Sequence, residues 1–348
     1  LLRERHAGPA DAVRRLVGKM AHVINQPRFD PARKLVVEGY GILQPRVTLA
    51  LPHGSEGSWF QRVFSGARGM DPYASPVSDV YQDLFGEGTF LGKGIYDVDA
   101  FEASMEGRSP ENAILSHDLF EGIFSRAGLA GDVEVVEAFP RRYDVATSRQ
   151  HRWARGDWQL LGWLVERKRL PGMGGPATLL GRWKMLDNLR RTLSAPVTVV
   201  ALFLGWLLPP AACLIWTAFV LVALAAPAIL PVILGAFHVS PRSTWRLHFA
   251  SVGSELGVAV AQTGFVIATL VHQAALMMDA IVRTLWRLAV SRKRLLEWTT
   301  AEQAAQKAEM GLAGFFRWMW TSPLLGLAAL FVAFAHGDAT GLVAVPFA

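Results

Sequence analysis

The sequence predicts an α/β domain followed by interfacial amphipathic helices and transmembrane α-helices. Strand-like and helix-like patterns alternate over residues 1–170, which is typical of an α/β layer. Hydrophobic residues make up 51% of the chain and the mean hydropathy is +0.26, and both values are high for a purely soluble protein. A run without acidic or basic residues extends from Thr192 to Pro241, which is long enough for two membrane crossings.

Two segments of the α/β part have the composition of β-strands. The stretch KLVVEGYGILQPRVTLAL, residues 34–51, is rich in β-branched and apolar residues. Pro45 within it marks an edge strand or a bulge, because proline has no N–H for the ladder. The stretch DVEVVEAFP, residues 132–140, returns as a second strand segment.

Two other segments of this part predict helices. In residues 10–25, apolar residues recur at intervals of three and four, as in an amphipathic helix: Val13, Leu16, Val17 and Met20. The stretch SPENAILSHDLFEGIFSRAGL, residues 109–129, predicts a helix opened by Ser109, Pro110 and Glu111. We assign residues 1–170 as a whole to one domain.

Membrane spans are predicted on both sides of Pro209 and Pro210, which interrupt the uncharged run near its middle. At about 1.5 Å per helical residue, the run is too long for a single crossing of a core roughly 30 Å thick. We place the two spans at residues 195–211 and 215–237, within a segment 195–238. Residues 309–348 predict a further transmembrane helix, from Gly311 to Ala335, and the start of another.

Two segments predict helices at the membrane surface. In residues 171–194, apolar residues share one helical face: Trp183, Leu186, Leu189 and Leu193. Residues 239–308 include a helical pattern from 255 to 305, of which 255–280 is long enough to cross a bilayer. Gln262, His272 and Gln273 interrupt that part, so we expect an interfacial, partly covered helix instead of a crossing.

The net charge of +6 comes largely from basic residues that flank the apolar runs. By the positive-inside rule these flanks lie on the cytoplasmic side, and residues 1–190 begin without the pattern of a signal peptide. We therefore expect a multi-pass protein whose first part is cytoplasmic. The basic residues do not form a patch interleaved with aromatic residues, so nucleic acid is not expected as a partner. A single cysteine, Cys213, excludes an internal disulfide.

Asp118 and the motif R-x-x-R-W are the candidates for chemistry. A carboxylate at the end of an element can take a proton from an attacking hydroxyl, although an aspartate that caps a turn has the same pattern. Arg149 and Arg152 can stabilise a diphosphate with forked donors, and Trp153 can stack on a sugar ring. A surface helix with an arginine over an aromatic ring is the structural alternative.

The glycine-rich stretch FGEGTFLGKGIY matches neither a dinucleotide-binding motif nor a Walker loop. It remains a candidate substrate-contacting loop, with Glu87 and Lys93 as its polar groups. Asp97 and Asp99 have D-x-D spacing, which could hold a hard cation against diphosphate oxygens. A turn between a strand and a helix is the favoured interpretation of that pair.

Taken in order, Asp118, the R-x-x-R-W motif, the amphipathic helix and the paired spans resemble the processive membrane glycosyltransferases of the GT-A fold. Five stretches are similar to the synthase region of bacterial cyclic β-1,2-glucan synthases: GYGILQPRV, FGEGTFLGKGIYDVDAFE, LSHDLFEG, RWKMLDNLRRTLSAP and DAIVRTLWRL. The resemblance extends over nearly the whole chain.

The resemblance implies transfer of glucose from UDP-glucose, with Mg²⁺ or Mn²⁺, to the 2-hydroxyl of a growing glucan at the bacterial inner membrane. It implies that Asp118 is the general base on the acceptor. Arg149 and Arg152 then hold the diphosphate and Trp153 forms the floor of the acceptor site. We also expect His117 and Glu87 to bind substrate.

The family's first aspartate and its D-x-D precede the segment that PADAVRRLVGKMAH matches here, where this chain has LLRERHAG. We therefore expect an internal piece of a longer synthase, without the D-x-D ligands of the cation. Two alternatives stay open: a catalytically inactive membrane remnant, and another processive polysaccharide synthase such as a cellulose-synthase-like enzyme.

Overall fold

The computed structural model describes residues 9–50, 57–66, 79–108, 113–115, 118–165, 177–238, 244–297 and 311–345. The chain divides into two compact units. The first combines residues 1–190 with 280–304, and the second combines 191–279 with 305–348. Two long helices, α8 (Leu179–Gly205) and α10 (Trp245–Trp286), each contribute residues to both units.

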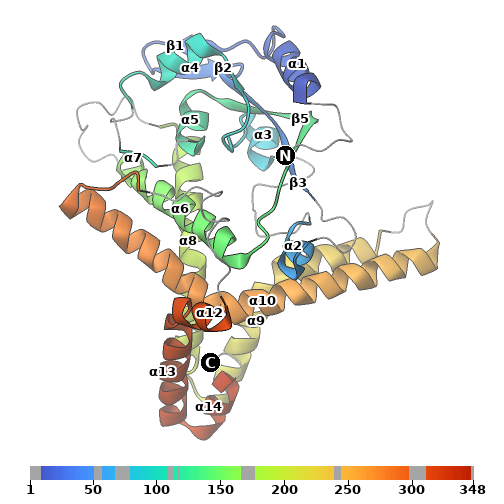
Figure 1. Ribbon diagram of the computed structural model, residues 1–348, viewed down its shortest axis with the longest axis vertical. Helices are drawn as coiled ribbons and strands as arrows, with labels where there is room; N and C mark the ends of the chain where they lie inside the picture. Colours follow the sequence, from blue (N-terminus) through green and yellow to red (C-terminus); the bar gives the residue numbers. More distant parts are fainter. Residues whose placement is uncertain are drawn as a thin grey trace. The chain divides into compact units, whose positions relative to one another are not determined.

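The first unit contains a three-stranded sheet of order β4-β3-β5, of which β3 and β5 are labelled in Figure 1. The central strand β3 (Ile42–Leu49) pairs in parallel with β5 (Ala127–Glu137) and antiparallel with the short β4 (Ile95–Tyr96). The register between β3 and β5 shifts between Pro45 and Arg46. This shift confirms the bulge that Pro45 predicts, because the missing N–H of proline interrupts a regular ladder. Both predicted strand segments are therefore present.

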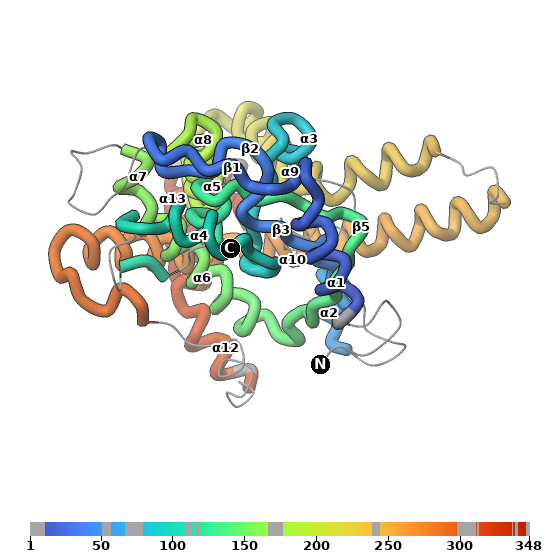
Figure 2. The backbone as a smooth tube through the Cα atoms, turned by 90° about the horizontal axis from the view of Figure 1, so that it is seen from above, coloured from blue at the N-terminus to red at the C-terminus, as the bar shows by residue number. Residues whose placement is uncertain are grey.

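Helix α1 (Pro9–Met20) packs on the strands β3 and β5, as the two views in Figures 1 and 2 agree. Ala12 and Leu16 are its buried apolar residues, and they meet Ala130 and Val133 of β5. The predicted helix 10–25 is confirmed as far as Met20, after which the chain turns. Its packed face is rotated from the expected one, however, because Val13 and Val17 are both 53% exposed.

The second predicted helix begins later than expected. Its pattern suggested a start at Ser109, whereas α5 extends from Asp118 to Phe124 and residues 113–115 are not helical. The N–H of Leu115 is bonded to a side chain of another helix, Gln159 Oε1 at 2.6 Å. A tertiary hydrogen bond thus takes the place of the helical one that periodicity predicts.

Helix α5 contributes to a core with α7 (Leu161–Val165) and the first turns of α8. Helix α6 (Tyr143–Gln159) ends directly before Leu160, which is a member of this core. The buried members of this core are Ile114, Leu119, Phe120, Ile123, Phe124, Leu160, Trp163, Ala177 and Met185. Shorter elements of the unit are β1 (Arg28–Asp30), β2 (Leu35–Glu38), α2 (Trp59–Phe64), α3 (Val80–Phe85) and α4 (Val98–Met105). This core packs α5 against Leu160, the residue that directly follows α6, so it fixes the helix that begins at Asp118 near the end of the helix that carries R-x-x-R-W.

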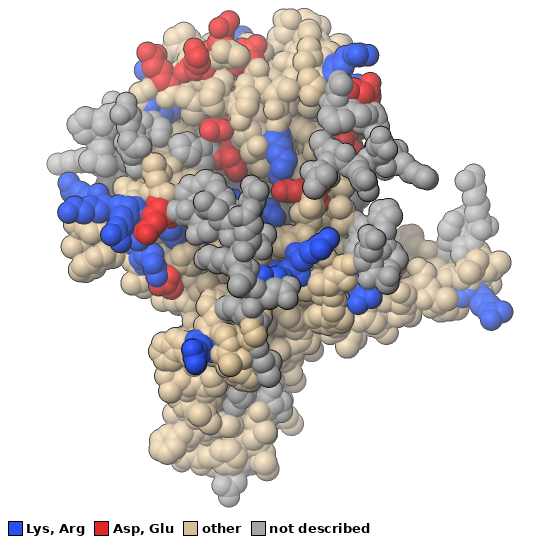
Figure 3. Space-filling model, viewed as in Figure 1, with Lys and Arg blue, Asp and Glu red and all other residues tan. Residues whose placement is uncertain are grey.

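The second unit is helical in the residues that the structure describes. It includes α9 (Pro210–Ala236), α12 (Leu312–Trp318), α13 (Thr321–His336) and α14 (Asp338–Ala344). Its buried residues include Leu202, Trp206, Cys213, Val220, Leu270, Ala333 and Ala344. The visible surface over α13 and α14 is almost without charged side chains in Figure 3. Apolar side chains also cover much of α9, of which Ile215, Phe219 and Val222 are more than 60% exposed.

Two helices are long and apolar enough to cross a membrane, Pro210–Ala236 and Trp245–Ser291, among the residues described. The first matches the predicted span 215–237. The predicted span 195–211 is not one of these two candidates. Residues 195–205 form the second part of α8, which continues without a break from the predicted interfacial helix. The predicted interfacial helix 255–280 lies within the second candidate, so its length and composition also permit a crossing.

Helix α10 continues as a π-helix from Arg287 to Ser291 and then stops, although the pattern predicted a helix to residue 305. Arg292 ends it with a φ angle of +50°, and Arg294 follows with +57°. Left-handed backbone at both positions breaks the helical hydrogen bonds. Residues 298–310 lie outside the described part of the chain.

Candidate functional site

Gly92 lies directly against the carboxylate of Asp118. A β-carbon added to Gly92 would lie 2.8 Å from Oδ1 of Asp118 and 2.9 Å from Oδ2. The φ angle of Gly92 is +76°, in the left-handed region where glycine is favoured. The glycine-rich loop and the predicted base therefore meet, and the close approach requires the absence of a side chain.

The loop that carries Gly92 is held by buried polar groups. Gln44 of β3 is 2% exposed, and its Nε2 donates to the carbonyl of Thr89 at 2.6 Å. The Oε1 of the same amide accepts from the N–H of Leu91 at 2.9 Å. Asp79 accepts from the N–H of Thr89 at 2.6 Å. These bonds hold the loop backbone beside the carboxylate.

Asp118 shares its surroundings with Glu121 and Tyr96. Asp118 is the first residue of α5, and Glu121 lies one turn later. Burial raises the pKa of the Tyr96 hydroxyl, and the charges of Glu121 and then Asp118 raise it further. Tyr96 is thus a neutral phenol at neutral pH, able to donate a hydrogen bond beside two carboxylates.

The R-x-x-R-W motif lies on α6. The guanidinium carbon of Arg149 is 5.0 Å from the centre of the Trp153 ring, a cation–π contact. Burial lowers the pKa of Arg152, the charge of Arg149 lowers it further, and the charge of Asp118 acts in the opposite direction. Arginine keeps its charge at neutral pH despite such a shift. Helix α6 therefore brings a guanidinium within electrostatic range of the candidate base.

Glu137, the last residue of β5, connects the loop to the motif. Its Oε2 is 2.8 Å from Nζ of Lys93, which follows Gly92 in the chain. Its Oε1 is 3.6 Å from Nη2 of Arg149. One carboxylate thus lies between two cations that belong to different parts of the candidate site.

Glu87 forms an ion pair with Lys184 of α8. The Oε1–Nζ distance is 3.0 Å, and the side chains are 11% and 2% exposed. Lys184 also donates to the carbonyl of Gly88 at 2.9 Å and lies over the ring of Tyr81. A charge buried to this degree needs such a partner. The pair anchors the glycine-rich loop to α8, and substrate binding by Glu87 stays a prediction.

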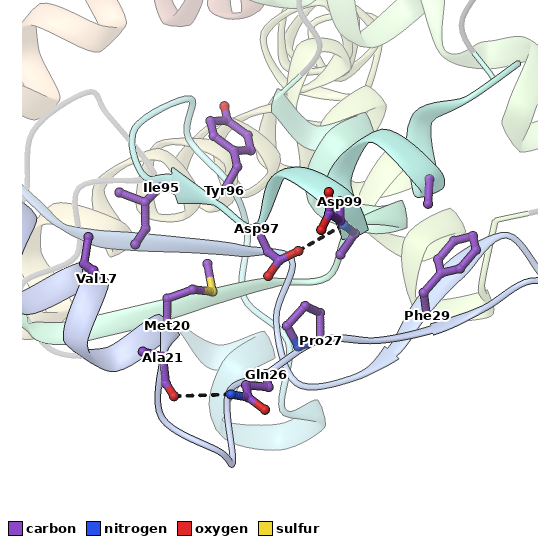
Figure 4. Close-up of a pocket in the computed structure, with 12 residues that line it drawn as sticks. Val17, Met20, Ala21, Gln26, Pro27, Phe29, Ile95, Tyr96, Asp97 and Asp99 are labelled. Atoms are coloured by element: carbon purple, nitrogen blue, oxygen red, sulfur yellow. Dashed lines mark hydrogen bonds between the residues drawn. The ribbon is translucent and has the colours of Figure 1, made fainter.

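Asp97 and Asp99 lie where β4 passes into α4, as the favoured interpretation of their spacing predicts. Asp97 is the N-cap of α4, and its Oδ1 accepts from the N–H of Ala100 at 3.0 Å (Figure 4). Both aspartates line a pocket of about 720 Å³ with residues of α1 such as Val17. No cluster of three metal-ligating side chains occurs in the described parts of the chain. The pair alone is therefore a poor fit to a divalent cation.

His117 lies outside the described residues. Of the other predicted site residues, the structure brings Asp118 and Arg152 into electrostatic range and places Arg149 over Trp153. Sequence reasoning missed Glu121 and Glu137. Glu121 could have been found, because it lies one helical turn after Asp118 in the same motif. Glu137 has no such local signal, since its partners come from distant segments.

The arrangement combines a carboxylate, a neutral phenol, guanidinium groups and an indole ring. Asp118 can accept a proton from a hydroxyl that approaches beside Gly92. Arg149 and Arg152 can stabilise an anion, and the ring of Trp153 can stack on a sugar. A carboxylate that can act as a base and guanidinium groups that can stabilise an anion are suited to a group transfer to a hydroxyl.

No family model matches the chain. A search of curated proteins finds the cyclic beta-(1,2)-glucan synthase NdvB of Rhizobium meliloti (strain 1021), which is 47% identical over 339 residues. The match covers 97% of this chain and 12% of that synthase. The chain therefore spans only about an eighth of the length of the curated relative that it matches. At this identity the chain is homologous to one segment of that cyclic β-(1,2)-glucan synthase.

Proposed function

We propose that this chain forms the acceptor side of a membrane-bound inverting glucosyltransferase. The reaction transfers glucose from UDP-glucose to a growing β-1,2-glucan, on a domain of the GT-A class. The contact between Gly92 and the carboxylate of Asp118, next to the charge of Arg152, is the observation that carries the proposal. The 47% identity to a cyclic β-(1,2)-glucan synthase supports the substrate class.

Asp118 acts as the general base. It takes the proton of the acceptor 2-hydroxyl as that oxygen attacks C1 of glucose and the bond from C1 to the diphosphate oxygen breaks. A single displacement of this kind inverts the configuration at C1. Tyr96 lies in the electrostatic field of both Glu121 and Asp118, and as a neutral phenol it can donate a hydrogen bond beside the base.

Arg149 and Arg152 stabilise the negative charge of the leaving UDP, and Trp153 forms the floor of the acceptor site. His117, next to Asp118 in the sequence, completes the substrate contacts. A divalent cation is the family's usual partner of the diphosphate. The residues described here fit it poorly, because Asp97 caps a helix and no cluster of three ligands is present among them. We assign its ligands to a part of the longer synthase outside this chain.

The bacterial inner membrane is the proposed location, with the first unit in the cytoplasm. The two apolar helices Pro210–Ala236 and Trp245–Ser291 support a membrane-bound protein. The basic flanks of the apolar runs support a cytoplasmic face for the sequence before them. Both sugar donor and glucan acceptor would then meet beside the lipid bilayer.

The test is Asp118→Asn in the full-length synthase, with Asp83→Asn, an exposed aspartate of α3, as the matched control. Loss of a general base lowers the rate by about 10²- to 10⁴-fold. We expect such a loss of glucose incorporation, while UDP affinity stays close to that of the unmodified enzyme. Unchanged turnover in Asp118→Asn would remove Asp118 from the chemistry.

A second outcome separates the enzyme from the inactive remnant. Metal-dependent β-1,2-glucan synthesis by the unmodified synthase, identified by linkage analysis, is required by the proposal. A product with another linkage would instead favour a different processive synthase. Absence of any product would favour the remnant.

A further inference from the structure

Gln159, the last residue of α6, uses both ends of its side-chain amide. The side chain is buried, with 4% of the residue exposed. Its Oε1 accepts from the N–H of Leu115 at 2.6 Å, three residues before Asp118. Its Nε2 donates to the carbonyl of Leu295 at 3.0 Å. One amide thus joins the segment before the base to the segment after α10.

Arg155 strengthens the second of these contacts. It is 6% exposed, and its Nη1 donates to the carbonyl of Glu297 at 2.7 Å while Nη2 donates to that of Leu295 at 3.3 Å. Arg287 donates to the carbonyl of Arg294 at 2.5 Å and pairs with Glu297 at 2.6 Å. Side chains therefore satisfy carbonyls that would bond within the helix if α10 continued.

The three α6 residues involved lie on one face of the helix. Arg152, Arg155 and Gln159 are spaced three and four apart, so successive turns bring them into line. Arg152 interacts electrostatically with Asp118. Arg155 and Gln159 donate hydrogen bonds to the carbonyls of Glu297 and Leu295. This face of α6 connects the candidate base to the end of the α10 segment.

We propose that Gln159 is a positioning residue that sets the place of Asp118 through the backbone of Leu115. The inference rests on the proposed function, because Asp118 must be the base for its position to matter. Residues 292–297 support the amide from the other side. Any shift of this segment is then passed to the base through one side chain, without contact between Gln159 and the reacting atoms.

The geometry of the two hydrogen bonds explains why Gln159 can fix the position of Asp118. The Gln159 amide cannot rotate freely, because its oxygen and its nitrogen are each bonded to backbone groups. Removing it leaves the N–H of Leu115 without this partner and takes away a restraint on the backbone three residues before Asp118. A displacement of about 1 Å at a catalytic group can cost on the order of 100-fold in rate.

The experiment uses the full-length synthase with Gln159→Leu and Gln159→Glu. The leucine removes both hydrogen bonds, whereas the glutamate keeps an oxygen that accepts from Leu115. We expect Gln159→Leu to lower kcat by about 10- to 100-fold with little change in the KM for UDP-glucose. Gln159→Glu should recover a large part of that loss.

Gln61→Leu is the matched control, because Gln61 also uses both ends of its amide, for the N–H of Ser58 and the carbonyl of Phe139. It should lower thermal stability without the selective loss of kcat. The inference fails if the two leucine variants have the same kcat, or if Gln159→Glu is as slow as Gln159→Leu.

Asp118→Asn, assayed in parallel, distinguishes failure of the positioning role from failure of the proposed function. An inactive Asp118→Asn together with a normal Gln159→Leu rejects the positioning role and keeps the proposed function. An active Asp118→Asn rejects the proposed function, and the positioning role with it.

Discussion

Gly92 shows at the scale of one residue how the site limits substitution. Gly92→Ala places a methyl group within 2.8 Å of the Asp118 carboxylate, on a backbone with a positive φ angle. The backbone strain alone costs on the order of 1–2 kcal/mol. The carboxylate must also move, so we expect glucose incorporation by the full synthase to fall by about 100-fold.

The matched control for this change is Gly18→Ala on α1, where an added β-carbon meets no atom within 4 Å. In a helix interior that change stabilises by roughly 0.5–1 kcal/mol. Thermal unfolding and incorporation are measured for both variants. Activity in Gly92→Ala equal to that of Gly18→Ala would contradict a tight contact between the loop and the base.

The individual candidate residues were predictable only in part. The motif order nominates Asp118, Arg149 and Arg152, and their roles stay predictions. Neither the contact of Gly92 with Asp118 nor the bridge through Glu137 follows from spacing. Both depend on how segments far apart in the chain fold together.

At the scale of elements, α1 is tied to β5 by charge as well as by packing. Asp132 of β5 lies 2.9 Å from Lys19 and 3.1 Å from Arg15 of α1. The hydrogen bond from Lys19 is the main cause that lowers the pKa of Asp132 below its usual 3.8. Because the pKa of Asp132 is lower in the folded state than in the unfolded state, its carboxylate stabilises the fold at pH values above the unfolded-state pKa. This contribution is lost as the pH falls through the folded-state pKa.

Asp132→Asn should therefore lower the thermal stability of the synthase slightly at about pH 6 and by less at about pH 3, because the contribution of the carboxylate is lost as the pH falls toward its folded-state pKa. The effect is small, because the Asp132 side chain is 55% exposed and water screens the pair. Hydrogen exchange of the α1 amides provides the local measurement, with Asp83→Asn as the control. An equal difference at both pH values would show that charge is not the cause.

Element types were easier to predict than element ends. Both strands and α1 follow from composition and period, and the Pro45 bulge follows from a missing N–H. The starts and ends depend on tertiary hydrogen bonds. The N–H of Leu115 donates to the side chain of Gln159 and not to a carbonyl of a helical turn. After α10, the carbonyls of Leu295 and Glu297 accept from the side chains of Gln159 and Arg155. No local pattern contains those partners.

At the scale of the whole molecule, the apolar helices and the basic residues that flank the apolar runs predict a multi-pass membrane protein. Helix α9 is uncharged over its full length, and its largest apolar side chains are exposed. In water this surface would cause aggregation, whereas in lipid it is satisfied. The turn at Pro209 separates the two predicted spans, so it should lie on the membrane face opposite to the basic flanks.

The single cysteine of the chain makes this topology directly testable. In a synthase whose other cysteines have also been replaced, Cys213→Ser provides the background for two variants at exposed positions, Val80→Cys on α3 and Leu208→Cys at the turn. A membrane-impermeant maleimide reacts with a thiolate in water and not with one in lipid. In intact spheroplasts we expect Leu208→Cys to be labelled and Val80→Cys to be protected, because in the proposed topology only the turn faces the periplasm. Inside-out vesicles should give the reverse pattern. Labelling of both positions from the same side would mean that residues 195–211 do not cross the membrane, and the spans would then have to be sought in α9 and α10.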